Sequence, residues 1–121
     1  MEDMMIDKEF RLFLPKKYNG KRINKKDFDD ILRRISNRFG GSTVFNSIGV
    51  WKDDKGKLIK EPVWVITADR DVSKIIEDDI KFMSDMGVEL GKRFNQDVMF
   101  ETRDNIEVKQ ILTKKNLKGV I

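Results

Sequence analysis

The fold is decided by the stretch from Arg38 to Ile66, which reads RFGGSTVFNSIGVWKDDKGKLIKEPVWVI. Gly40-Gly41 ends a helix, because glycine adopts the left-handed cap conformation without a steric penalty. Asp53-Asp54-Lys55-Gly56 predicts a tight turn whose glycine takes a positive φ. The stretch therefore predicts a helix end followed by a β-hairpin with strands over 42–51 and 58–67.

The spacing of apolar residues predicts the elements on either side of this stretch. Residues 9–14 alternate between apolar and polar side chains, as a half-buried strand does. A first helix follows the N-cap Asn24, a second follows a cap at Asp71 or Ser73, and a last strand covers 97–102. The second helix is expected to bury an apolar stripe of Val72, Ile75, Ile76, Ile80, Met83, Val88 and Leu90.

The element order β-α-β-β-α-β is typical of a ferredoxin-like α+β sandwich, with a four-stranded antiparallel sheet and two helices on one face. We expect the first and third strands to be central and to run parallel to each other. The other sheet face then exposes Phe13, Met99 and one side of the apolar run 63–66. Because contiguous exposed apolar side chains usually mark an interface, we expect a homo-oligomer that buries this open face.

Length and composition predict one domain. The chain has 121 residues and no cysteine, so no disulfide framework holds it together. We assign 1–7 to a lead-in, 8–105 to the ferredoxin-like domain and 106–121 to a C-terminal extension that could form a short strand or helix. The acidic first residues and the lack of a long apolar run predict a soluble, cytoplasmic protein without membrane association.

Charge is nearly balanced, with 25 basic and 21 acidic residues, but it is unevenly distributed. Basic residues dominate from Lys16 to Arg38, and acidic residues dominate from Asp69 to Asp85. This pattern indicates either an anionic partner or two solvated helix faces of opposite sign. Arg11-Leu12-Phe13 resembles a strand of an RNA-recognition sheet only weakly. We therefore expect no nucleic-acid binding.

The absence of histidine and cysteine excludes Ser-His-Asp and Cys-His nucleophilic sites and the zinc sites built on these ligands. The glycines before Ser42 follow a helix, so they predict a cap and not a phosphate-binding loop. We expect no metal and no cofactor, and we assign no catalytic residue. Catalysis, if present, would rest on carboxylates, lysines, Tyr18 or arginines.

One group of residues could hold a small ligand. Trp51 and Glu61 could lie near each other across the hairpin, and Gln96 introduces the last strand. A tryptophan, Trp51 or Trp64, beside a carboxylate and an amide provides apolar surface and polar contacts. The alternative is structural: Trp51 packs the hairpin, Glu61 pairs with a lysine, and Gln96 caps a turn.

A longer pattern resembles an uncharacterised family of small bacterial proteins known only as a domain of unknown function. The matching motifs are Phe28, Arg38-Phe39-Gly40-Gly41-Ser42-Thr43-Val44, Gly49-Val50-Trp51, Gly56, Glu61 and Arg93-Phe94-x-Gln96-x-Val98. The resemblance covers residues 10–101 and implies the fold but no activity. It nominates Thr43, Trp51, Glu61 and Gln96 as positions of interest.

These observations predict a non-enzymatic ligand-binding or assembly module that acts as a homo-oligomer. The alternative is a small enzyme that uses Glu61 as a base in a pocket lined by Trp51. A third possibility is an RNA-binding module. The candidate binding residues are Thr43, Trp51, Glu61, Trp64 and Gln96.

Overall fold

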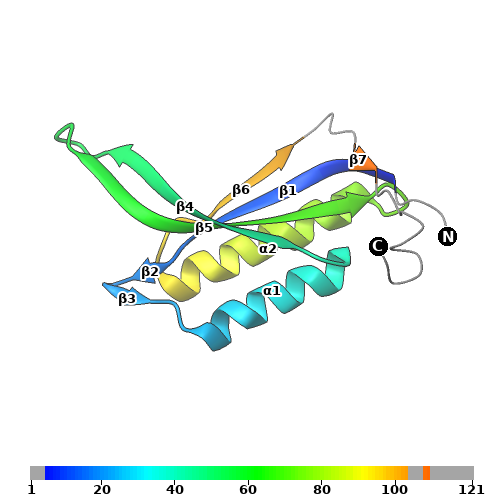
Figure 1. The fold of residues 1–121 in the computed structure, drawn as a ribbon, viewed down its shortest axis with the longest axis horizontal. Coiled ribbons are helices and arrows are strands. Elements are labelled where there is room, and N and C mark those ends of the chain that lie inside the picture. The colour runs from blue at the N-terminus through cyan, green and yellow to red at the C-terminus, as the bar shows by residue number, and fades with distance from the viewer. Residues whose placement is uncertain (1–4, 104–107, 110–121) are drawn as a thin grey trace, which may run out of the picture.

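A computed structural model describes residues 5–103 and 108–109 of the chain. Two long helices lie side by side against one face of a twisted sheet (Figure 1). The elements in chain order are β1 (Met5–Pro15), β2 (Lys17–Tyr18), β3 (Lys21–Arg22), α1 (Lys25–Phe39), β4 (Thr43–Lys52), β5 (Leu58–Asp71), α2 (Ile76–Phe94), β6 (Met99–Arg103) and β7 (Val108–Lys109).

The main sheet has the strand order β4-β5-β1-β6, with the short strand β7 also paired to β1. All of these strand pairs are antiparallel. The antiparallel sheet and the two helices confirm an α+β fold that fits a ferredoxin-like arrangement. The small β2–β3 pair is not indicated by the sequence, whereas β7 is a short strand of the kind that the sequence allows in the C-terminal extension.

The expectation that the two central strands are parallel is wrong. β1 and β5 pair antiparallel, with Leu12 opposite Ile66. The reason is connectivity: the tight turn after β4 reverses the chain, and β5 then inserts between β4 and β1. Because β5 is antiparallel to both neighbours, β1 and β4 share one direction.

The core lies between the helices and the even-numbered positions of the central strands. Phe10, Leu12 and Leu14 are fully buried, as the alternation in the sequence predicts. The run Val63–Ile66 is buried on both faces, so the expectation that one of its sides is exposed on the open face is wrong. On the open face its valines are covered by cross-strand neighbours, since Val65 lies between Phe13 and Phe45.

Helix α1 begins and ends as the sequence predicts. The Asn24 side chain accepts a hydrogen bond from the Asp27 backbone N–H at 2.8 Å. Gly40 takes a φ of 86°, and its N–H bonds to the Ser36 carbonyl. The two caps fix the start of α1 and the point at which β4 can begin.

Helix α2 differs from the prediction at its start and along its buried face. Asp71 does not cap it; its carboxylate accepts the Ser73 N–H, and Ile75 occupies the N-cap position without a side-chain bond. The predicted stripe residues Ile75 and Val88 are 63% and 57% exposed. The buried positions, spaced by three or four residues as on one helix face, are Asp79, Met83, Met86, Leu90 and Phe94.

The segment expected to be a polar loop contains a small β2–β3 hairpin and a buried lysine. Lys16 is 8% exposed, and its Nζ donates to the Asn46 side-chain oxygen at 2.6 Å. The same ammonium lies 5.5 Å from the centre of the Trp64 ring. This segment therefore seals the end of the core at which the β4–β5 hairpin projects past the helices (Figure 1).

In the expected C-terminal extension, Val108–Lys109 pairs with β1, and the remainder of 106–121 lies outside the described residues. The expected lead-in at 1–7 likewise includes residues outside that range, and β1 already begins at Met5. No helix in the described part is long and apolar enough to cross a membrane.

Candidate active site

A cavity of about 490 Å³ lies on the open face of the sheet, on the side away from the helices. Most of its wall comes from odd-numbered strand positions, whose side chains share this face. Its lining residues are Phe13, Pro15, Ser47, Ile48, Gly49, Val50, Trp51, Glu61, Val63, Gln96, Asp97 and Met99.

The register of the β4–β5 hairpin brings Trp51 and Glu61 to the same cavity. Gly49 lies directly opposite Glu61, and Trp51 lies opposite Ile59. Trp51 follows Gly49 by two residues, so both face the same side of the sheet as Glu61. The Trp51 side chain is 45% exposed, which leaves much of its surface free for a planar ligand.

Glu61 is a partly buried carboxylate in the wall of the cavity. Partial burial raises the pKa of its carboxyl group above the usual value. Within the described residues no cation forms an ion pair with it, which contradicts the structural alternative of a Glu61–lysine pair. A carboxylate with a raised pKa accepts a proton more readily than an ordinary one.

Gln96 reaches the cavity from the turn between α2 and β6. Asn95 takes a left-handed conformation, with φ 50°, and the Gln96 N–H bonds to the Gly91 carbonyl at 3.1 Å. This turn fixes the backbone of Gln96 beside the end of β6, where Met99 pairs with Phe13. The amide and the Asp97 carboxylate thus form a polar rim across from Trp51.

Two of the predicted binding residues lie elsewhere. Trp64 points to the helix side, where it is 7% exposed and stacks on Phe28 with ring centroids 3.9 Å apart. Thr43 is on the open face but at the opposite end of β4, where it pairs with Thr67 and lines a different cavity. The structure therefore brings together Trp51, Glu61 and Gln96 only.

Sequence reasoning missed the smaller and the apolar members of the site. Phe13 and Met99 were assigned to an interface, and Ser47 and Asp97 were not singled out. Gly49 appeared only within the family motif, although a glycine in the middle of a strand is itself a signal for close approach.

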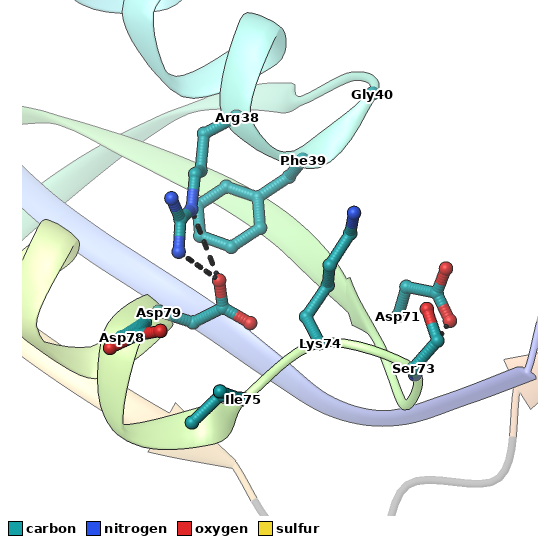
Figure 2. Close-up of a pocket in the computed structure, with 9 residues that line it drawn as sticks. All are labelled: Arg38, Phe39, Gly40, Asp71, Ser73, Lys74, Ile75, Asp78 and Asp79. Atoms are coloured by element: carbon teal, nitrogen blue, oxygen red, sulfur yellow. Dashed lines mark hydrogen bonds and ion pairs between the residues drawn. The ribbon is translucent and has the colours of Figure 1, made fainter.

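A second cavity, of about 540 Å³, lies at the opposite end of the molecule, beside the end of α1 and the start of α2 (Figure 2). Arg38 donates two hydrogen bonds to one oxygen of Asp79, at 3.1 and 2.8 Å. The buried Arg70 bonds the other oxygen at 3.2 Å. Since Asp79 is 1% exposed and its charge is paired, this cluster holds elements together and presents no free carboxylate.

No cluster of three or more potential metal ligands occurs among the described residues. The polar groups that line the cavity beside Trp51 are two carboxylates, one amide and one hydroxyl. Such groups can bind a cationic ligand and move a proton.

Comparison with solved structures shows that the fold is similar to that of an enzyme. No family model and no curated protein matches the sequence. A phage SAM lyase in complex with S-methyl-5'-thioadenosine matches with a TM-score of 0.63 and 20% identity, over 87% of this chain and 85% of that one. A phage SAM lyase in the apo state matches with a TM-score of 0.63 and 21% identity, over 88% and 86%. The likeness shows a shared fold.

These matches contradict the main functional prediction and the inclination against an enzyme. The two matching structures, which cover most of this chain, are both of a phage SAM lyase, and a lyase is an enzyme. The prediction gave too much weight to the missing histidine and cysteine, because carboxylates alone can carry acid–base chemistry. The comparisons agree better with the alternative prediction, a small enzyme, than with the main one.

Proposed function

We propose that the protein is a lyase that binds SAM (S-adenosylmethionine) in the open-face cavity and releases S-methyl-5'-thioadenosine from it. The observation that carries the proposal is that one cavity joins Trp51, Glu61 and Gln96. This cavity lies on a fold shared with a phage SAM lyase. We also propose that the chain is a ferredoxin-like βαββαβ sandwich to which β2–β3 and β7 are additions.

The groups in the cavity match the three parts of SAM. The exposed ring of Trp51 provides a surface for the purine, since aromatic rings stack in offset arrangements. The Glu61 carboxylate attracts the positive sulfonium, and that attraction is stronger in a partly desolvated site than in water. The Gln96 amide both donates and accepts hydrogen bonds, so it suits the amino-acid end or the ribose hydroxyls.

Release of the thioether requires that the electron pair of one carbon–sulfur bond moves to the sulfonium, which becomes neutral. In our proposal Glu61 accepts a proton from the carbon next to the breaking bond. The C–H electron pair then forms a carbon–carbon double bond, so the second product is an unsaturated amino acid. If the second product is instead a lactone, the substrate's own carboxylate has displaced the thioether, and Glu61 serves to hold the cation.

The experiment is incubation of the purified protein with SAM, followed by chromatographic measurement of S-methyl-5'-thioadenosine. We expect release by the wild type and a loss of about 100-fold or more in Glu61→Gln, the range typical for removal of an acid–base group. Glu101→Gln is the matched control, because Glu101 lies on β6, outside the cavity. Equal rates in the wild type and Glu61→Gln, or no release by either, would contradict the proposal.

We further propose that a second copy of the chain packs on the open face around the mouth of the cavity and leaves the cavity accessible to the ligand. Three large apolar side chains are exposed there: Phe45 is 53% exposed, Trp51 45% and Met99 66%. Together with the cavity they form an apolar surface, as expected of an interface. Light scattering at micromolar concentration should give a mass of two or more times 14.2 kDa, and a strictly monomeric mass would rule out this assembly.

A further inference from the structure

Gly49 stands in the middle of β4, where glycine is unfavourable. A glycine inside a strand loses more conformational entropy than alanine and costs roughly 0.5–1 kcal/mol. The glycines with positive φ in the described residues are Gly20, Gly40 and Gly56, so the backbone at Gly49 does not require glycine. Another reason must account for the missing side chain.

The space around Gly49 supplies that reason. A Cβ atom built on Gly49 would lie 3.2 Å from Cγ2 of Val63 and 3.9 Å from Cγ of Glu61. The first distance is shorter than an ordinary van der Waals contact, and Val63 and Glu61 both line the open-face cavity. Gly49 itself also lines the cavity, so its backbone forms part of the cavity floor beside Glu61.

Gly49 also lies between the two groups that define the site. Trp51 is the next residue of β4 on the same face, about 7 Å along the strand. Glu61 is directly opposite Gly49 on β5. The Cβ positions of residues paired in this way are about 5 Å apart. The order Trp51, Gly49, Glu61 parallels the order purine, ribose, sulfur in the proposed ligand.

We propose that Gly49 determines which ligands the cavity accepts, because its missing side chain admits the ribose–sulfur segment between Trp51 and Glu61. This inference rests on the proposed function. A methyl group at position 49 would fill the floor, so the purine and the sulfur could no longer reach Trp51 and Glu61 together. The cavity then selects thionucleosides by the depth of its floor as well as by charge.

The test is calorimetric titration of S-methyl-5'-thioadenosine into the wild type, Gly49→Ala and Gly41→Ala. We expect Gly49→Ala to raise the Kd about tenfold or more. Gly41→Ala is the matched control, since a Cβ at Gly41 would meet no atom within 4 Å. We expect its Kd to stay within about twofold of the wild type, below the 1.4 kcal/mol of a tenfold change.

The same substitution in a Val63→Ala background distinguishes two explanations for weaker binding by Gly49→Ala: a filled cavity floor and a strained β4–β5 sheet. In Val63→Ala the atom that a methyl at position 49 would press against is absent. If Gly49→Ala still weakens binding in this background, the loss comes from the filled floor and supports the inference. Recovery of full affinity in the double variant would overturn it, as would a Gly49→Ala Kd equal to that of the wild type. No binding by the wild type would overturn the proposed function as well, so the two failures are distinguishable.

Discussion

Two acidic residues of β5, Glu61 and Asp69, lie on the open face and share one electrostatic property. Burial raises the pKa of both carboxyl groups, and the charge of Glu9 raises that of Asp69 further. Glu9 is the residue directly opposite Asp69 on β1. Both carboxyl groups therefore hold a proton more readily than ordinary carboxyl groups do, which at Glu61 supports the proposed role as a base.

The opposed carboxylates Glu9 and Asp69 predict that Asp69→Asn makes the protein more stable, by an amount that depends on pH. Like charges directly opposite on adjacent strands are destabilising, and Arg11 compensates Glu9 through a 2.5 Å ion pair but not Asp69. Asp69→Asn should therefore raise the free energy of unfolding by about 0.5 kcal/mol at neutral pH. Urea unfolding near pH 7 measures the change.

The sign of the pH effect follows from the raised pKa of Asp69. The folded state holds the Asp69 proton more tightly than the unfolded state, so this contribution to stability is present below the ordinary pKa and is lost as the pH rises. The gain from Asp69→Asn should consequently vanish near pH 3, below the usual aspartate pKa of about 3.9. Asp54→Asn, in the exposed hairpin turn, serves as the control. A gain that is equal at both pH values would show that charge is not its cause.

The sequence alone could not predict every site residue, because it does not show which face of the sheet each strand residue occupies. Trp51 and Trp64 were both plausible, because the run 63–66 is apolar at every position and shows no alternation. The face of Trp64 is set by the hairpin register, which pairs it with Asn46 and Leu14. Register depends on how the whole sheet pairs, so no local pattern could separate the two tryptophans.

Helix α2 is the element whose packing the sequence predicted least well. Its buried face includes a charged residue, Asp79, which an apolar pattern cannot contain. The partners of Asp79 are Arg38 at the end of α1 and Arg70 at the end of β5. Arg38 lies 41 residues from Asp79 in the chain. The burial of Asp79 is thus a tertiary property, whereas the caps of α1 and the β4–β5 turn are local and were predicted correctly.

This cluster predicts a large loss of stability in Asp79→Ala. Removal of one partner of a buried ion pair is strongly destabilising. Here it deletes the carboxylate that pairs with both Arg38 and Arg70, and the Arg70 side chain is buried. Such a change typically costs about 3–5 kcal/mol, and we expect a loss in that range by denaturant unfolding. Asp78→Ala, one residue earlier in the same helical turn but exposed, should change stability by less than about 0.5 kcal/mol. Similar losses in both variants would mean that the turn, and not the ion pair, is responsible.

At the scale of the whole molecule, ion pairs link the two helices that carry much of the unevenly distributed charge. Arg34 of α1 donates two hydrogen bonds to Glu89 of α2, at 2.6 and 3.0 Å, which lowers the pKa of that carboxyl group. In a second pair the base is on α2 and the acid is on α1: Arg93 pairs with Asp27. Ion pairs of both senses therefore join the two helices, and the pair that links the basic segment to the acidic one is Arg38–Asp79. The absence of nucleic-acid binding stays a prediction.

The two faces of the sheet have separate roles in this account. The helix side carries the core and the buried ion pairs, and the open side carries the cavity with Trp51 and Glu61. Variants in the cavity should consequently change ligand binding with little effect on folding. The helix-side variant Asp79→Ala should have the reverse effect.

The central claim, that the open-face cavity binds a thionucleoside, is tested most directly by the two tryptophan indole N–H signals in an NMR titration with S-methyl-5'-thioadenosine. The chain has two tryptophans: Trp51 is 45% exposed in the cavity, and Trp64 is 7% exposed in the core. Assignment follows from Trp51→Phe, which removes one signal. The account predicts that the Trp51 signal shifts in a saturable way while the Trp64 signal does not move. A Trp51 signal that stays fixed at saturating ligand would contradict the account.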